Sequence, residues 1–344
     1  MSPTTTTIII SSLATGTILT ASSYHWFMAW VGLELNTLAI IPIISKQHHP
    51  RATEAATKYF LTQAAASATI LFSSTMNAWL LGTWDIINST HPIANTLLTV
   101  ALAMKLGLAP MHFWLPEVLQ GSTMKTAMII ATWQKLAPIA LIYQTSNNLS
   151  PMILLIMGMT SALLGGWTGL NQTQTRKIMA YSSIAHLGWM AVIVVMLPNI
   201  MLLNLFIYLL MTISMFYALL LLNSKNIKDM ATSWTTSPMT TSTNMLILLS
   251  LAGLPPLTGF IPKWLILEEL TTQNLITVAL IMALSTLLSL FFYLRLTYSS
   301  TITLSPNTMM STYKWRFKQP ANTLPLSITL PPATMLLPMT PMLC

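Results

Sequence analysis

Charged side chains are scarce in this chain of 344 residues. Asp, Glu, Lys and Arg make up only 6% of it, whereas 54% of the residues are hydrophobic. An ordinary soluble domain carries about 25% charged residues, and so few charges cannot cover a surface that faces water. The sequence therefore predicts an all-α, polytopic membrane protein whose natural solvent is lipid.

Cysteine is almost absent as well. The single cysteine, Cys344, is the last residue. One cysteine forms no intrachain disulfide, no Cys-ligated iron–sulfur cluster and no Cys-rich zinc site. The chain also has no Rossmann glycine motif and no P-loop. We therefore expect neither a cofactor nor a metal site in this chain.

Targeting signals are missing at the N-terminus. The first apolar run has no basic start and no small-residue cleavage site, and no Arg-rich transit peptide precedes it. We expect this run to be kept as the first membrane helix. A mitochondrial location would then require synthesis inside the organelle.

Long apolar runs, in contrast, are abundant. A spanning helix needs about 20 mostly apolar residues, and the chain contains eleven such runs. The last run is the least regular because five prolines fall inside it, and proline removes helical hydrogen bonds. The predicted spans are 5–22, 24–45, 59–81, 93–118, 124–145, 151–170, 178–197, 200–222, 242–270, 275–296 and 323–343.

The formal net charge of +8 arises in alternate connections between these spans. Every connection after an even-numbered span holds Lys or Arg, and no connection after an odd-numbered span does. No basic stripe with interleaved aromatics is present, so nucleic acid is not expected as a partner. The positive-inside rule places the N-terminus on the side of the basic connections and the C-terminus on the opposite side. In a mitochondrial protein the side of the basic connections is the matrix. The basic residues concerned are Lys46, Arg51, Lys58, Lys125, Arg176, Lys177, Lys225, Lys228, Arg295, Lys314, Arg316 and Lys318.

Four ionisable residues fall inside spans instead: Glu34, Lys105, Lys135 and Lys263. Each charge at mid-membrane costs at least ~2.5–3.5 kcal/mol, so such residues suggest a function. Burial disfavours an ammonium and a nearby carboxylate favours it, which allows a lysine to take up and release a proton. Glu34 could act as the switch. The alternative is structural: ion pairs that fix helix packing or, for Lys263, a side chain that reaches the membrane interface.

Two histidines also lie within spans, His112 and His186. Histidine titrates near physiological pH and can relay protons. A hydrogen-bonded packing role is an equal alternative for His186.

Two segments of the chain repeat each other. Residues 107–117 read GLAPMHFWLPE and residues 253–263 read GLPPLTGFIPK. A shift of 146 aligns their first glycines and two prolines six residues apart, and it places Glu117 opposite Lys263. Each proline removes a backbone donor, so we expect both helices to be broken here. Two accidental kinks are the alternative.

The repeated segments lie in the fourth and the ninth span, which cross the membrane in opposite directions. This offset predicts an inverted repeat of two five-helix halves, 1–145 and 146–296, followed by a matrix loop and a last helix over 297–344. In transporters with inverted repeats, broken helices line the ion site. Lys105, His112 and Lys263 all lie close to the breaks.

Several of these stretches resemble the antiporter-like membrane subunits of respiratory complex I. They include WVGLELN, KYFLTQA, MKLGLAPMHFWLPEV, WQKLAPI, GLNQTQTRKIMAYSSIAHLGWM and GLPPLTGFIPKW. The resemblance covers nearly the whole chain. It implies that Glu34 pairs with Lys105, that Lys135 and Lys263 continue a proton path, and that His112 and His186 lie between them.

The resemblance also implies partners and a location. The chain would be a core membrane-arm subunit of the proton-pumping NADH:ubiquinone oxidoreductase in the mitochondrial inner membrane, among further antiporter-like subunits and lipids. FMN, iron–sulfur clusters, NADH and ubiquinone would lie on partner subunits. One alternative is a stand-alone or Mrp-type cation/proton antiporter subunit, although one acid and three lysines make a poor cation site. The other is a structural scaffold, which has no use for four costly charges.

Overall fold

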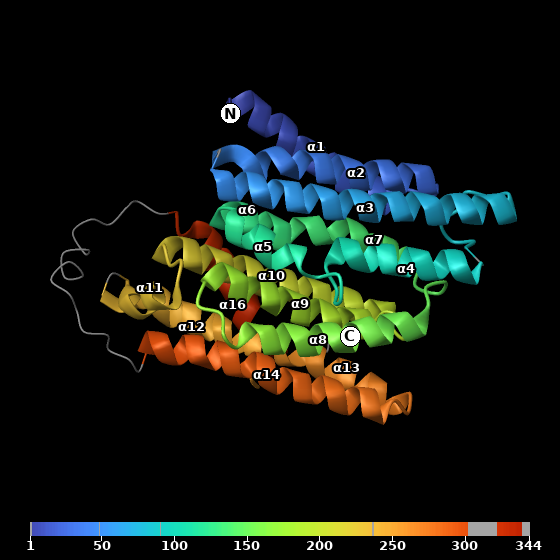
Figure 1. The fold of residues 1–344 in the computed structure, drawn as a ribbon. Helices are drawn as coiled ribbons and strands as arrows, with labels where there is room; N and C mark the ends of the chain where they lie inside the picture. Colours follow the sequence, from blue (N-terminus) through green and yellow to red (C-terminus); the bar gives the residue numbers. More distant parts are fainter. Residues whose placement is uncertain (1, 48, 90, 236, 302–321, 339–344) are drawn as a thin grey trace. The chain divides into compact units, whose positions relative to one another are not determined.

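The computed structural model describes residues 2–47, 49–89, 91–235, 237–301 and 322–338. Within these ranges the regular structure is helical, as Figure 1 shows, which confirms the all-α class. The chain forms two compact units. Unit 1 comprises Met1–Ser161 and Ala191–Pro198, and unit 2 comprises Ala162–Met190 and Asn199–Cys344. The predicted boundaries of the inverted repeat are a different division and stay a prediction.

Unit 1 begins with three long helices, α1, α2 and α3. Ser2 starts the first of them, because its hydroxyl accepts a hydrogen bond from the backbone N–H of Thr5. Proline occupies the first turn of α1, α3 and α4, where its missing N–H costs nothing. The helices of this unit are α1 (Pro3–Ser22), α2 (Trp26–Ile44), α3 (Pro50–Leu81), α4 (Pro92–Leu106), α5 (Trp114–Gly121), α6 (Met124–Ala131), α7 (Leu136–Gln144) and the first part of α8 (Pro151–Gly169), with 3₁₀ turns η1 (Ser45–Gln47) and η2 (Trp133–Lys135).

Unit 2 holds the remaining helices. At the start of α11 the carboxylate of Asp229 accepts hydrogen bonds from the backbone N–H groups of Lys225 and Asn226, at 3.1 and 3.0 Å. The elements are the rest of α8, most of α9 (Thr175–Ile193) and α10 (Pro198–Leu222), α11 (Ile227–Thr232), η3 (Ser233–Thr235), α12 (Pro238–Ala252), α13 (Phe260–Thr272), α14 (Ile276–Thr301) and α16 (Leu324–Met335).

Six helical segments among the described residues are long and apolar enough to cross a membrane. Each matches one of the predicted spans, but the predicted total of eleven is not confirmed. Two other predicted spans are interrupted helices, and α3 and α9 are continuous but richer in polar residues. The six segments are Pro3–Ser22, Trp26–Ile44, Met124–Gln144, Pro151–Gly169, Pro198–Leu222 and Ile276–Thr301.

The last predicted span, 323–343, is described only in part. Helix α16 runs from Leu324 to Met335 and contains Pro331 and Pro332. The buried hydroxyl of Thr258 donates a hydrogen bond to the carbonyl of Ala333, which ties α16 to the rest of unit 2. Residues 339–344 lie outside the described residues. The predicted basic residues of the 302–321 connection also lie outside them.

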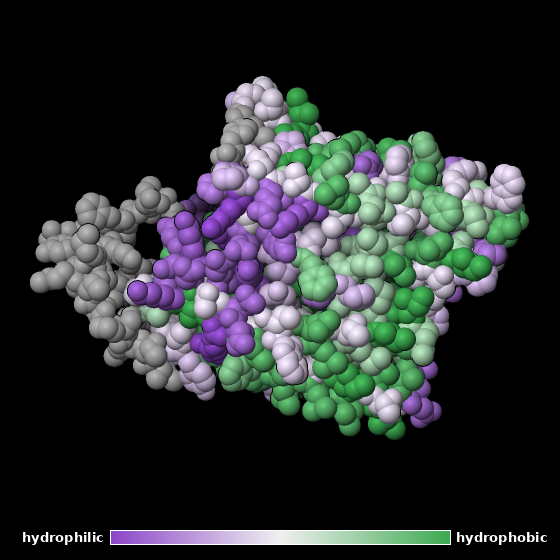
Figure 2. Space-filling model, in the orientation of Figure 1, coloured by the Kyte–Doolittle hydropathy of each residue, from purple (hydrophilic) through white to green (hydrophobic). Residues whose placement is uncertain are grey.

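Large apolar side chains cover much of the face drawn in Figure 2. The exposed ones occur on several helices, and the indole of Trp79 is 88% exposed. A surface of this kind suits lipid or partner helices rather than water. Further examples are Ile8, Ile18, Phe72, Trp167, Leu280 and Phe291.

Alternate connections gather at opposite ends of unit 1. Backbone hydrogen bonds join the connection after α1 to the one after α3, from Trp26 to Trp84 (3.1 Å) and from Ile86 to Tyr24 (3.1 Å). The side-chain amide of Gln144, at the end of α7, donates to the carbonyl of Ala21 at 2.8 Å. These connections contain neither Lys nor Arg.

The basic connections of unit 1 meet at the other end. Gly121 ends α5 so close to α3 that an added Cβ would lie 2.6 Å from the carbonyl oxygen of Arg51. Lys46, Lys58 and Lys125 are carried by the same two connections and the helix turns beside them. The separation of basic and non-basic connections therefore holds within this unit.

The basic connections of unit 2 meet in the same way. The backbone N–H of Thr175 donates to the carbonyl of Lys225, and Ile227 donates to Thr173, each at 3.1 Å. The guanidinium of Arg295 donates to the carbonyl of Gln172 at 2.8 Å. Hydrogen bonds thus join the connections after α8 and α10 to the end of α14.

Helices α1 and α2 pack at close range through two glycines. A Cβ added to Gly32 would lie 2.6 Å from the side chain of Thr20 and 2.9 Å from the carbonyl oxygen of Gly16. Neither backbone can move away without separating the two helices.

We therefore expect Gly32→Val to push α1 away from α2. The overpacking should destabilise the helix pair by about 1–3 kcal/mol and lower the thermal midpoint of the assembled protein. Ser11→Val is the matched control, because Ser11 is exposed on α1 and this change should leave the midpoint unaltered. Equal midpoints for both variants would contradict the close packing.

Candidate functional site

The first predicted break lies between α4 and α5. Helix α4 ends at Leu106, and Gly107 takes a left-handed backbone with φ of 80°. The N–H groups of Gly107 and Leu108 both donate to the carbonyl of Ala103, at 2.9 and 3.0 Å. Glycine adopts this φ without steric cost, which makes it a common helix terminator.

A side chain from beyond the break completes this helix end. The indole N–H of Trp114, the first residue of α5, donates to the carbonyl of Met104 at 3.2 Å. The last carbonyls of a helix have no partner within the helix, so such a donor stabilises the end. Lys105 is the next residue, and its side chain is buried.

Lys135 lies in a second irregular segment of unit 1. The 3₁₀ turn η2 separates α6 from α7 and ends at Lys135. Pro138 follows three residues later, and its ring has no N–H and crowds the carbonyl of Gln134, so a continuous α-helix cannot form. A 3₁₀ stretch within a helix often marks a functional hinge.

A small cavity is lined by both lysines, whose side chains are buried. Lys105 and Lys135 line it together with Tyr59 and Gln134. The volume that the centre of a water molecule can occupy is about 10 Å³. That is room for about one water. The hydroxyl of Tyr59 donates to Oε1 of Gln134 at 3.4 Å. Other polar residues on the wall are Asn36, Thr37 and Gln63.

Glu34 lies close to the cavity without joining an ion pair. It is half-buried in α2, and its neighbour Leu33 lines the cavity. The ion pairs that Lys58 forms do not include Glu34. Oε2 of Glu34 and Nζ of Lys105 are both buried and have no hydrogen-bond partner in the described part of the chain. The carboxylate of Glu34 and the ammonium of Lys105 are therefore not joined by a hydrogen bond.

The second predicted break lies in unit 2, between α12 and α13. Helix α12 ends at Ala252, and Gly253 has a left-handed φ of 79°. The ammonium of Lys263, in the first turn of α13, donates to the carbonyl of Ala252 at 2.7 Å. The side chain is only 9% exposed, so it points at the helix end rather than the surface. The peptide bonds before Pro110 and Pro256 are cis in the two breaks.

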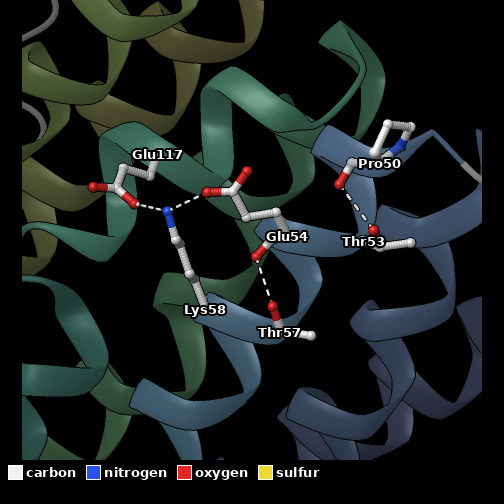
Figure 3. Close-up of polar contacts among 6 residues, drawn as sticks. All are labelled: Pro50, Thr53, Glu54, Thr57, Lys58 and Glu117. Carbon is white, nitrogen blue, oxygen red and sulfur yellow. Dashed lines mark hydrogen bonds and ion pairs between the residues drawn. The ribbon is translucent and has the colours of Figure 1, made fainter.

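Glu117, which the repeat aligns with Lys263, has a different environment. Glu117 is exposed on α5, and its Oε2 lies 2.6 Å from Nζ of Lys58. The same ammonium lies 2.5 Å from Oε1 of Glu54, as Figure 3 shows. This exposed cluster links α3 to the half-helix after the first break.

The two histidines lie in different units. His112 is buried within the first break, its ring stacks on Phe113 with centroids 4.4 Å apart, and Nδ1 has no hydrogen-bond partner among described residues. His186 is buried in α9, with its ring centroid 5.6 Å from that of Tyr208. Of the six predicted site residues, Lys105 and Lys135 line one cavity, Glu34 and His112 belong to the same unit, and Lys263 and His186 belong to the other.

The neutral residues of the cavity were missed by sequence reasoning. Tyr59, Gln63 and Gln134 carry no charge, so a search for charges inside spans passes over them. One signal was available, since Tyr59 and Gln63 recur on the buried face of α3, four residues apart. In the described part of the chain no group of His, Cys, Asp or Glu side chains could hold a metal.

Comparison with known proteins decides the family. The model for "NADH:quinone oxidoreductase/Mrp antiporter, TM" matches residues 23–289. The chain belongs to this family. A second model, "NADH dehydrogenase subunit 2 C-terminus", matches residues 290–344.

One similar relative of this antiporter family is NADH-ubiquinone oxidoreductase chain 2 from Salmo salar. It is 58% identical over 341 residues, which cover 99% of this chain and 98% of the relative. Its name agrees with the resemblance found in the sequence.

Solved structures agree in fold. A chain of respiratory complex I from Thermus thermophilus is 27% identical with a TM-score of 0.80, and the match covers 96% of this chain and 78% of that one. A chain of an Mrp complex from a Dietzia species is 16% identical with a TM-score of 0.78, over 87% of this chain and 61% of that one. The second likeness concerns the fold alone.

The lack of a hydrogen bond between Glu34 and Lys105 predicts a mild effect of Glu34→Gln on assembly. Removing one partner of a buried ion pair costs about 3–5 kcal/mol, but Glu34 makes no such pair here. The assembled protein should keep a thermal midpoint close to that of Glu268→Gln, a change at an exposed acid on α13. A collapse of assembly in Glu34→Gln alone would instead indicate a structural ion pair.

Proposed function

We propose that this family member is a core membrane-arm subunit of the proton-pumping NADH:ubiquinone oxidoreductase, respiratory complex I, in the mitochondrial inner membrane. It provides an intramembrane proton path coupled to electron transfer from NADH to ubiquinone on other subunits. The observation that carries this proposal is the cavity lined by the buried side chains of Lys105 and Lys135, beside Glu34. The identity to a full-length relative named for that enzyme supports it.

In unit 1 the proposed carriers are the two lysines of the cavity. Burial disfavours an ammonium, and the carboxylate of Glu34 favours it. A change in the distance or charge of Glu34 therefore shifts the proton between Nζ of Lys105 and its surroundings. A single water in the cavity beside Tyr59 and Gln134 would connect Lys105 to Lys135, because both neutral side chains offer hydrogen-bonding atoms.

In unit 2 the proposed carrier is Lys263, which the second break holds at the end of α12. His112 and His186 are proposed relays, because an imidazole can accept a proton at one nitrogen and release one from the other. For His186, packing against Tyr208 remains the alternative role.

The energy for pumping comes from outside this chain. Moving one charge against the membrane potential requires about 2.3 kcal/mol per 100 mV. We propose that NADH, FMN, iron–sulfur clusters and ubiquinone are bound by partner subunits, and that the other membrane-arm subunits, including further antiporter-like ones, transmit the energy by contact or charge rearrangement. Membrane lipids cover the exposed apolar helices.

The proposed topology has eleven spans, with the N-terminus in the matrix and the C-terminus in the intermembrane space. The two five-helix repeats are 1–145 and 146–296, followed by the loop and helix of 297–344. The gathering of basic connections at one end of each unit supports this arrangement. The positive-inside rule then places those ends in the matrix.

A stand-alone or Mrp-type cation/proton antiporter subunit is the second candidate, because the fold is shared with a chain of an Mrp complex. Copurification with flavin and iron–sulfur subunits would exclude it. A purely structural scaffold is the third candidate, and it gives no reason for a buried lysine without a hydrogen-bond partner.

Proton pumping in vesicles tests the proposal. Lys105→Met removes the ammonium from the cavity, so pumping by the fully assembled enzyme should fall at least ~10-fold, as expected for loss of a proton-transfer group. NADH oxidation should become slow or uncoupled. Glu34→Gln removes the carboxylate that is proposed as the switch, so it should also lower proton pumping.

The matched control is Lys125→Met, because Lys125 is exposed near the start of α6. It should pump like the native enzyme. Native pumping and turnover in both Lys105→Met and Glu34→Gln would show that these charges have only structural roles.

A further inference from the structure

The two broken helices end alike but receive different donors. Both end at a left-handed glycine, Gly107 and Gly253. At the first break the donor to the exposed carbonyls is the indole of Trp114, and at the second it is the ammonium of Lys263. An indole N–H keeps its proton at physiological pH, whereas an ammonium can release one. The second break therefore ties a helix end to a transferable proton.

The end of α12 is a favourable place for that ammonium. The last carbonyls of a helix lack partners within the helix and carry partial negative charge. A hydrogen bond from a cation to such a carbonyl is stronger than one between neutral groups. The distance of 2.7 Å between Nζ of Lys263 and the carbonyl oxygen of Ala252 fits a bond of this kind.

Gly253 leaves the room in which this bond forms. A Cβ added there would lie 2.8 Å from Nζ of Lys263 and 2.9 and 3.0 Å from its Cδ and Cε. At Gly107 the three atoms nearest to the added Cβ would be carbons of Leu115 and Trp114, at 3.2 to 3.5 Å. A larger residue at the second break would therefore meet the lysine side chain, in addition to the strain of the positive φ.

We propose that Gly253 is a positioning residue for proton transfer, because it leaves the space in which the ammonium of Lys263 lies against the carbonyl of Ala252. The inference rests on the proposed proton path and adds a residue to it. Because the ammonium is fixed, it donates its proton from the same position in each turnover. A displacement of about 1 Å in a reacting group can cost about 100-fold in rate.

The test compares two glycine substitutions in the assembled enzyme. Gly253→Ala puts a methyl group into the space of the lysine. Gly82→Ala is the matched control, since Gly82 also has a left-handed φ, of 72°, but has nothing within 4 Å of the added Cβ. Both carry the same kind of backbone strain. Thermal midpoint, NADH oxidation, proton pumping and the effect of D₂O on pumping are measured for each.

We expect Gly253→Ala to lower the pumping rate at least ~10-fold, with a larger D₂O effect because proton transfer limits the rate. Gly82→Ala should pump at the native rate with the native D₂O effect. If Gly253→Ala changes the thermal midpoint but neither pumping nor the D₂O effect, Lys263 is still correctly placed and the positioning role is wrong. Equal pumping and D₂O effects in the two variants would overturn the positioning role.

A third variant separates this inference from the proposed function. If Lys263→Met pumps normally, Lys263 is not a carrier, and the proposed path through it fails. If Lys263→Met stops pumping while Gly253→Ala matches Gly82→Ala, the path stands and the positioning role is wrong.

Failure of Gly253→Ala to assemble also gives a result. The double change Gly253→Ala with Lys263→Ala removes the side chain that the new methyl group meets. Restored assembly in the double variant would support the contact between the two residues. Continued failure of assembly would show that strain at φ 79° is the cause, and would overturn the inference.

Discussion

Hydrogen bonding of backbone groups at the helix breaks is the constraint on which the rest of the structure depends. In lipid, a carbonyl or N–H that a broken helix sets free has no water to bind, and each unsatisfied group costs several kcal/mol. Here the freed groups are bound locally, by the turns at Gly107 and Gly253 and by Trp114 and Lys263. The same breaks make room for polar side chains within apolar helices. Lys105 and Lys263 are buried there for that reason.

The cavity of unit 1 differs from a packed core in one respect. A core satisfies its buried polar atoms, but here Nζ of Lys105 and Oε2 of Glu34 have no hydrogen-bond partner among the described residues. Such groups usually indicate a bound water or a function that requires a change of partner. The small space beside Tyr59 and Gln134 agrees with both. The proposed proton path uses this incomplete pairing.

Much of the fold and of the candidate site could be predicted from the sequence, because glycine, proline and charged residues act locally. The Gly and Pro pattern predicted both breaks, and the alternation of basic connections agrees with the contacts at the ends of each unit. The roles of Tyr59 and Gln134 could not be predicted, since they depend on distant helices that face one cavity. The pairing of Glu117 with Lys58 was also missed, because the repeat aligned Glu117 with Lys263. The count of eleven spans is not confirmed, because polar helices such as α3 are not among the six helices that are long and apolar enough to cross a membrane.

The central claim is that Lys105 must release a proton and not only carry a charge. Lys105→Arg tests it most directly, because a guanidinium stays protonated throughout the physiological range. The measurement is proton pumping by the assembled enzyme in vesicles, with assembly confirmed. The account predicts that Lys105→Arg pumps as poorly as Lys105→Met. Pumping at the native rate in Lys105→Arg would contradict it and would assign Lys105 a purely electrostatic role.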